Sequence, residues 1–321
     1  MQTSKVVTML ASVAALSGVA YAGEVTGVAP VTSAGADLLV KGKDTVSVRF
    51  SGRTEFQWSD AGADGFGFRR VRLGSKAKLG SGWGSEIVFD ITDGSNGLAN
   101  TTQDAFVDKA VITKTIGGTK FSFGRSKVVF GYEETSSSSK GVFIERSRLN
   151  DRLDGQGPGG FYDRQSNITV SQDFGGGFSG ALSVADQTTG GQDPSYFGRL
   201  QWSNDAVTVG VDYADNNTLD AFTAYVDYKQ GGFNVLVEYY DADLAGVDVD
   251  GFVVRASYRI GDFEPVVRYS DYDFGASSDE ELLIGFNYYI APQVTFLAAY
   301  RDTEEGGVDA DSFTARLRVL W

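Results

Sequence analysis

The sequence predicts an all-β protein, a transmembrane, antiparallel, up-and-down β-barrel of about 16 strands. Segments in which apolar and polar residues alternate recur along the chain, as in TVSVRFSGRTEFQW (45–58). Glycine is abundant, with 41 residues, and proline is scarce, with 5, which suits many strands joined by turns. The connections alternate between short and long, as expected for a barrel with one rim of tight turns and one rim of loops.

The alternating segments define the predicted strands. In most of them the apolar residues share one parity, as do Val207, Val209 and Val211. Unpaired backbone groups cost several kcal/mol each in hydrocarbon, so an open sheet is excluded and the last strand must pair with the first. The predicted strands are 45–58, 66–79, 83–92, 103–115, 119–127, 164–173, 177–186, 195–203, 206–213, 219–229, 232–240, 251–260, 262–272, 280–290, 293–301 and 312–321.

The two ends of the chain indicate export. Lys5, the apolar stretch 6–19 and the small residues Ala20 and Ala22 predict a signal peptide over residues 1–22. A periplasmic leader segment (23–44) and the barrel (45–321) follow. The final segment FTARLRVLW ends on Trp321, which we expect in the aromatic girdle at the periplasmic rim. This ending also resembles the C-terminal signature by which bacterial outer-membrane barrels are recognised for insertion. We therefore expect the outer membrane of a Gram-negative bacterium, with its lipid around the barrel.

The composition excludes several classes of function. The chain has no Cys and no His, which removes Ser-His and Cys-His catalysis, zinc-thiolate sites and His-ligated metals. The formal net charge of -14 argues against nucleic acid as a partner. The acidic stretch DADLAGVDVDG (241–251) lacks EF-hand spacing. We therefore expect no catalytic residue, no cofactor and no metal. An outer-membrane lipase or protease, the enzyme alternative, would need a base that the sequence does not supply.

One connection is far longer than the others. Residues 128–162, VVFGYEETSSSSKGVFIERSRLNDRLDGQGPGGFY, form the third external loop of the predicted barrel. Loops of this length in a compact fold are usually functional or disordered. A floppy surface loop would suit the serine run 136–139, whereas Val142, Phe143 and Ile144 favour burial. We expect the loop to fold into the lumen.

Two stretches carry a family resemblance. SKVVFGYEETSSSSKGVFIERS (126–147) and FGFRRVRLGSKAKLGSGWGSEIVFDI (66–91) resemble the phosphate-selective porin O and P family, over roughly residues 45–185. The resemblance implies a porin whose third external loop constricts the pore, and a homotrimer. The positions that match the family pattern are Phe130, Gly131, Glu133, Glu145 and Arg146.

Strand parity predicts which charged residues face the lumen. A cationic set should form one basic wall where the last strand closes on the first, and a charged set on the loop should face it across a narrow passage, so that a transverse field orients solutes. The simpler alternative is that these charges only solvate a water-filled barrel. The predicted basic wall is Arg49, Arg53, Arg70, Arg72, Lys76, Arg316 and Arg318, and the predicted constriction-loop residues are Glu133, Glu134, Glu145, Arg146, Arg148, Asp151 and Asp154.

The predicted function is a water-filled channel for passive diffusion of ions and small hydrophilic solutes. We expect weak selectivity that leans to cations, because acidic external loops such as 241–250, 271–279 and 302–311 concentrate counter-ions at the mouth. No ladder is predicted from the lysines Lys76, Lys78, Lys109 and Lys120. A substrate-specific, phosphate-type anion channel and a plugged structural barrel are the alternatives.

Overall fold

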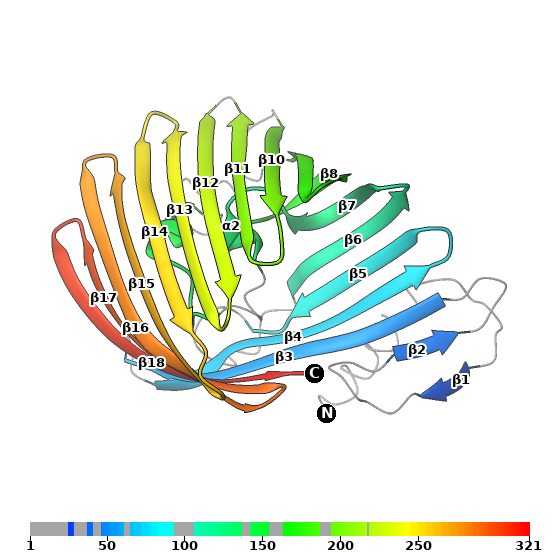
Figure 1. Cartoon of the computed structure of the whole chain (residues 1–321), viewed down its shortest axis with the longest axis horizontal. Coiled ribbons are helices and arrows are strands. Elements are labelled where there is room, and N and C mark those ends of the chain that lie inside the picture. The colour runs from blue at the N-terminus through cyan, green and yellow to red at the C-terminus, as the bar shows by residue number, and fades with distance from the viewer. Residues whose placement is uncertain are drawn as a thin grey trace.

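The chain forms a closed antiparallel barrel. The computed structural model describes residues 25–28, 37–40, 46–60, 65–92, 106–136, 142–153, 163–186, 194–216 and 218–321. Sixteen strands, from β3 (Val46–Ser59) to β18 (Val308–Leu320), each pair antiparallel with the next, and β18 pairs with β3 to close the ring (Figure 1). The barrel prediction and its strand number are therefore confirmed. The predicted signal peptide lies outside the described residues.

The other strands follow the predicted ranges closely. Two short helices, α2 (Tyr132–Thr135) and α3 (Arg148–Leu153), lie in the β7–β8 connection. None of the helices that the structure describes is long and apolar enough to cross a membrane. The remaining barrel strands are β4 (Gly65–Leu79), β5 (Trp83–Asp90), β6 (Phe106–Ile116), β7 (Thr119–Lys127), β8 (Arg164–Gly175), β9 (Phe178–Ala185), β10 (Ser195–Ser203), β11 (Val207–Asn216), β12 (Leu219–Gln230), β13 (Phe233–Leu244), β14 (Asp248–Tyr258), β15 (Phe263–Phe274), β16 (Ser277–Ala291) and β17 (Val294–Glu305).

The two faces of the sheet have opposite character. Large apolar side chains are exposed on the outer face, with Leu182 at 68% and Ile112 at 54%. Charged side chains are buried on the inner face, where Glu238, Arg268 and Glu281 are fully covered. A water-soluble fold would reverse this pattern, whereas a barrel with a lipid-facing exterior requires it.

The predicted acidic loops at 241–250, 271–279 and 302–311 are instead mostly strand. Their turns are only residues 245–247, 275–276 and 306–307, where Gly246, Gly275 and Gly306 have positive φ. Alternation explains the difference, as in 241–250, where Asp241 and Asp250 are exposed while Ala242 and Val249 point inward and are buried. Period-two alternation continues the strand past the point at which acidic composition predicted a loop.

Strand length varies around the ring. Strands β5 and β9 have 8 residues each, whereas β4 and β16 have 15. With a rise of about 3.4 Å per residue and a tilt of about 40°, these strands span about 21 Å and about 39 Å along the barrel axis. The wall is therefore of uneven height, and the tall strand β4 pairs directly with the short strand β5 (Figure 1).

The segment before the barrel extends the pairing at the junction of β3 and β18, which is called the seam below. Strands β1 (Val25–Val28) and β2 (Asp37–Val40) pair with each other, and β2 pairs with residues 46–49 of β3. That is the edge of β3 whose residues 53–59 pair with β18. The segment therefore continues the seam where the last strand ends.

Trp321 closes the seam against a glycine. Its backbone exchanges two hydrogen bonds with Gly52, with Gly52 N to Trp321 O at 2.6 Å and Trp321 N to Gly52 O at 3.1 Å. A Cβ at Gly52 would lie 2.2 Å from the indole ring, so only glycine leaves room for it. The ring is 47% exposed, as expected for a rim aromatic.

Candidate functional site

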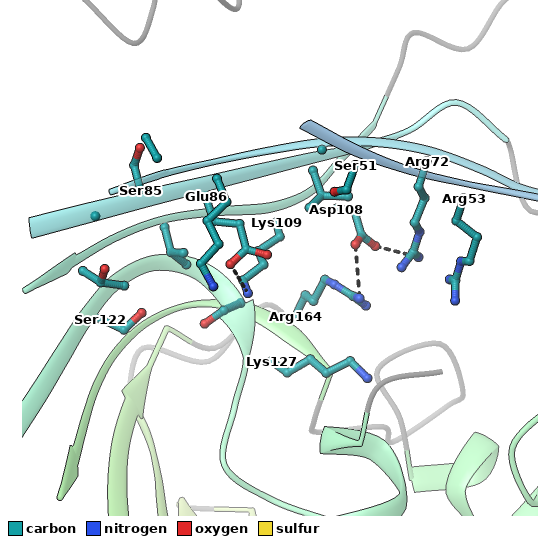
Figure 2. Close-up of a pocket in the computed structure, with 18 of the residues that line it drawn as sticks. Ser51, Arg53, Arg72, Ser85, Glu86, Asp108, Lys109, Ser122, Lys127 and Arg164 are labelled. Atoms are coloured by element: carbon teal, nitrogen blue, oxygen red, sulfur yellow. Dashed lines mark hydrogen bonds and ion pairs between the residues drawn. The ribbon is translucent and has the colours of Figure 1, made fainter. Parts of the chain in front are cut away.

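A cavity of about 730 Å³ lies inside the barrel along β3 to β8 (Figure 2). Thr135 and Ser136 of the β7–β8 connection contribute to its lining. Eight cationic and two acidic side chains line it, a formal balance of six positive charges. Hydroxyl groups supply most of the remaining polar lining. The cations are Arg53, Arg72, Lys76, Lys78, Lys109, Lys120, Lys127 and Arg164, and the acids are Glu86 and Asp108.

Five of these cations are ion-paired. Asp108 lies between Arg72, at 2.7 Å, and Arg164, at 3.1 Å, as Figure 2 shows. Lys109 pairs with Glu86 at 3.0 Å. Carboxylates outside the cavity lining add four pairs, Lys127–Glu134 at 2.6 Å, Arg72–Asp90 at 2.6 Å, Arg164–Asp163 at 2.9 Å and Arg53–Glu55 at 3.9 Å.

Three lysines of the cavity differ from the others. Lys76, Lys78 and Lys120 make no ion pair within the part of the chain that the structure describes, and all three are exposed to the cavity. An ammonium group without a carboxylate partner is the side chain most available to a passing anion. The unpaired charge of the cavity is therefore carried by lysine.

An apolar cluster formed by the β7–β8 connection and by β9 to β15 lies beside buried charged groups such as Glu238 and Arg268. Leu149 and Leu153 of α3 and Phe130 are fully buried against inward-facing side chains of β9 to β15, including Leu219 and Tyr272. This apolar cluster was not predicted, because strand parity was expected to place charged residues in the lumen. The same cluster includes small inward residues on β11 to β13. They are Ala214, Ala221 and Ala242.

The stretch 142–148 lies against β15 to β18. Asn287 donates to the carbonyl of Val142 at 2.7 Å, and Arg316 donates to the carbonyl of Ile144. Arg268 donates to the carbonyls of Glu145, at 2.6 Å, and Arg146, at 2.9 Å. Polar side chains of the wall therefore hold the main chain of this stretch.

The loop glutamates are paired with cations. Glu145 accepts from Arg69 Nε at 3.0 Å and also pairs with Arg316. Glu134 pairs with Lys127 at 2.6 Å and with Arg146 at 3.0 Å.

Glu133 and the helix that carries it are tied to the wall. The carboxylate of Glu133 accepts from Ser147 Oγ at 2.5 Å and pairs with Arg255 at 3.4 Å. Glu238 of β13 accepts the backbone N–H groups of Tyr132 and Glu133 at the start of α2. The loop acids are thus bound to the protein and do not stand free across a passage.

Comparison with known proteins decides the family. The sequence profile described as Gram-negative porin matches residues 8–307. The chain belongs to the Gram-negative porin family. It is therefore an outer-membrane channel. No curated protein is similar enough in sequence to count as a match.

Solved porin structures share this fold. An anion-selective porin from Comamonas acidovorans superimposes with a TM-score of 0.69 at 17% identity, covering 86% of this chain and 100% of the other. A loop L8 deletion mutant of OmpT, an outer membrane protein of Vibrio cholerae, gives 0.69 at 16% identity, covering 86% and 99%. A mutant of the Rh. blastica porin gives 0.62 at 18%, covering 86% and 100%. At these identities the likeness shows the fold.

The predicted basic wall of this porin is divided. Arg53, Arg72 and Lys76 line the cavity. Arg316 and Arg318 are buried at the seam, both paired with Glu55, which is itself 1% exposed. Of the other predicted residues, Arg70 lies 3.7 Å from Asp90, and Arg49 is exposed near the end of the seam.

The remaining predicted loop residues lie on α3 or beyond it. Arg148 pairs with Glu305 at 3.0 Å. Asp151 lies on α3, and Asp154 lies outside the described residues. Within the described residues, no group of three or more Asp or Glu side chains is arranged to hold a metal ion.

Sequence reasoning missed Arg69. Alternation placed Arg70 and Arg72 inward, which sends Arg69 outward. The β3–β4 register shifts between Glu55 and Phe56, so that Glu55 faces Arg70 while Phe56 faces Phe68. Arg69 is the extra residue of this β-bulge, and its side chain reaches Glu145 inside the barrel. No local sequence signal marks the bulge.

The shared location of the cavity lysines was not foreseen. The sequence predicted no ladder from Lys76, Lys78, Lys109 and Lys120, yet all four line one cavity. The strand register brings them to one region. Lys76 on β4 is paired with Glu86 on β5, and Glu86 is paired with Val111 on β6, two residues from Lys109 on the same face. Such a register depends on the stagger around the whole barrel.

The ion pairs of Glu145 and Glu133 should resist moderate acid. Burial opposes ionisation of Glu145, but attraction to Arg316 and Arg69 outweighs it and holds the pKa of this carboxyl well below its usual value. Burial likewise opposes ionisation of Glu133, and Arg255 and Arg268 reverse it, so that its pKa is lowered. A lowered pKa means that these ion pairs persist until the pH falls below the ordinary range of a glutamate.

We therefore expect the single-channel conductance to stay constant between pH 7 and about 4.5, near the ordinary glutamate pKa. Planar-bilayer recordings over this pH series check the expectation. A stepwise fall in conductance close to the ordinary glutamate pKa would show that the loop carboxylates are not held by arginine.

Proposed function

We propose that the protein is a weakly selective diffusion pore for small hydrophilic solutes and ions, in which residues 128–136 and 142–153 fold into the lumen and narrow it. The contacts of 142–148 with β15 to β18 and of α3 with the inward apolar cluster support this reading. They leave the cavity along β3 to β8 as the passage. A channel role rather than an enzymatic one follows from the same proposal.

We further propose that the passage prefers anions. The observation that carries this proposal is the cavity balance of six positive charges, three of them on lysines without an ion pair in the described part of the chain. The acidic outer ends of the strands favoured cations in the sequence analysis. Fixed charges act over about 8 Å at physiological salt, so the charges that line the passage outweigh those on the outer face of the barrel.

A phosphate-type channel is the second candidate. The resemblance to the phosphate-selective porin O and P family motivates it, and the gathering of Lys76, Lys78, Lys109 and Lys120 around one cavity favours it. A multivalent oxyanion would gain from several ammonium groups and hydroxyls at once. The mixed lining, in which Glu86 and Asp108 neutralise part of the charge, favours the general pore.

The assembly and its surroundings belong to the same proposal. A homotrimer in outer-membrane lipid is proposed from the family resemblance, and OmpT of Vibrio cholerae, similar in fold with a TM-score of 0.63, is described in a trimer form. Residues 1–22 are proposed to be a signal peptide, and Trp321 part of the insertion signal.

Reversal potentials in a potassium chloride gradient test the function. The folded, detergent-purified protein should insert into planar bilayers as discrete open channels. Its reversal potential should be shifted toward the equilibrium potential of chloride. The preference should weaken at 1 M salt, where the Debye length is about 3 Å. A reversal potential shifted toward the equilibrium potential of potassium would contradict the anion proposal. Absence of conductance steps would indicate a plugged barrel. Block of the chloride current by micromolar phosphate would favour the second candidate.

A further inference from the structure

The wall beside the cavity, formed by β15 to β18, binds the loop through the loop's main chain. The carbonyl oxygens of residues 142, 144, 145 and 146 each accept a hydrogen bond from a side chain on β15 to β18. Arg301 adds a second donor to the carbonyl of Arg146 at 3.1 Å. The backbone N–H of Arg148 donates to Glu281 at 3.1 Å. Such contacts fix the path of the segment whatever side chains it carries.

Arg268 lies at the centre of these contacts. Its side chain is 0% exposed, and its Nε donates to Glu281 at 2.6 Å across the β15–β16 pair. Its two terminal nitrogens reach the carbonyls of two consecutive loop residues. The guanidinium also lies 5.4 Å from the centre of the Phe143 ring. A planar fork of donors suits this simultaneous binding of wall and loop, and a single ammonium group does not.

An ordinary buried ion pair does not account for this arrangement. An Arg268–Glu281 pair that only stabilised the wall would direct all its donors to β-strand residues. Two of the three donor nitrogens instead serve the loop, and Glu281 uses its second oxygen for the loop backbone. The pair is electrically balanced and out of reach of a solute in the cavity, so it has little influence on ion preference.

We propose that Arg268 is the positioning residue of the pore: by holding residues 145 and 146 against β15 and β16, it sets how much of the lumen stays open. This inference rests on the proposed inward fold of residues 128–136 and 142–153. The arginines of β15 to β18 then fix the width of the passage, and the lysines of β4 and β7 fix its charge. A segment released from β15 and β16 can move into the neighbouring cavity.

Arg268→Lys tests the proposal while keeping the net charge. We expect single-channel conductance to fall roughly 1.5- to 2-fold, open-channel noise to rise and the polymer exclusion limit to drop, because the loop moves into the passage. The reversal potential should not change. The matched control is Arg259→Lys, since Arg259 is exposed, stacks on Tyr289 and donates to the carbonyl of Gly261, away from the loop. It should behave as wild type.

A second variant keeps the test decisive if Arg268→Lys does not fold. Asn287→Leu removes the donor to the Val142 carbonyl without changing charge, and we expect a smaller fall in conductance with the same increase in noise. Unchanged or increased conductance in the folded variants overturns the proposal. A wild-type pore without anion preference would instead contradict the proposed selectivity and leave this comparison intact.

Discussion

Replacing Lys76, Lys78 and Lys120 together by glutamate should turn an anion-preferring pore into a cation-preferring one. These three side chains are the cavity cations without an ion pair among the described residues, and the five that remain are each within 4 Å of a carboxylate. The unpaired charge of the passage would therefore change from three positive to three negative. The sign of the reversal potential in a salt gradient measures the change.

Lys114→Glu is the matched control for this charge reversal. Lys114 lies on β6, as Lys109 does, but it stacks over Trp83 at 5.0 Å, donates to the carbonyl of Ser81 and does not line the cavity. This variant should keep the wild-type reversal potential. If the triple variant also keeps the wild-type sign, ion preference is set outside the cavity and the anion proposal fails.

Glu55→Ala should cause the largest loss of stability of any single substitution at the seam. Glu55 is 1% exposed and is the shared partner of Arg316 and Arg318 on β18, with Arg53 3.9 Å away on its own strand. Its removal leaves a cluster of buried arginines uncompensated where the last strand closes on the first. Breaking a buried pair in this way costs about 3–5 kcal/mol.

The midpoint of urea unfolding in detergent, with the folded fraction after refolding, measures the Glu55→Ala effect. Glu280→Ala is the control, because Glu280 is exposed on the outer face, opposite Asp271 and Glu304, and its removal relieves like-charge repulsion. We expect the control to be at least as stable as wild type. Equal stability of Glu55→Ala and wild type would show that the arginines find other partners.

The strands could be predicted because each carries its own signal. Alternation of period two distinguishes the faces within a single segment, so β12 and β16 were located to within a few residues. The closure of β18 on β3 followed from backbone chemistry alone. The loop at 128–162 was recognised by its length and by its apolar residues, such as Ile144, which is 6% exposed.

The site could be predicted only in part, because its geometry depends on contacts distant in sequence. Arg268 contacts Glu145 across 123 positions, and nothing in either local sequence indicates the pairing. The bulge that turns Arg69 inward likewise has no local sequence signal. The gathering of the lysines required the barrel stagger, which alternation within single strands does not reveal.

The unequal height of the wall has a consequence for the surrounding bilayer. The apolar band of an outer-membrane barrel is about 25 Å tall, whereas an 8-residue strand such as β5 or β9 rises only about 21 Å. Large apolar residues are nevertheless exposed there, among them Leu182 and Ile168. Hydrophobic mismatch must be relieved on this side, either by local thinning of the lipid or by replacing the lipid with a neighbouring protein. The surroundings of this porin are therefore not uniform, and the mismatch is greatest beside β5 and β9.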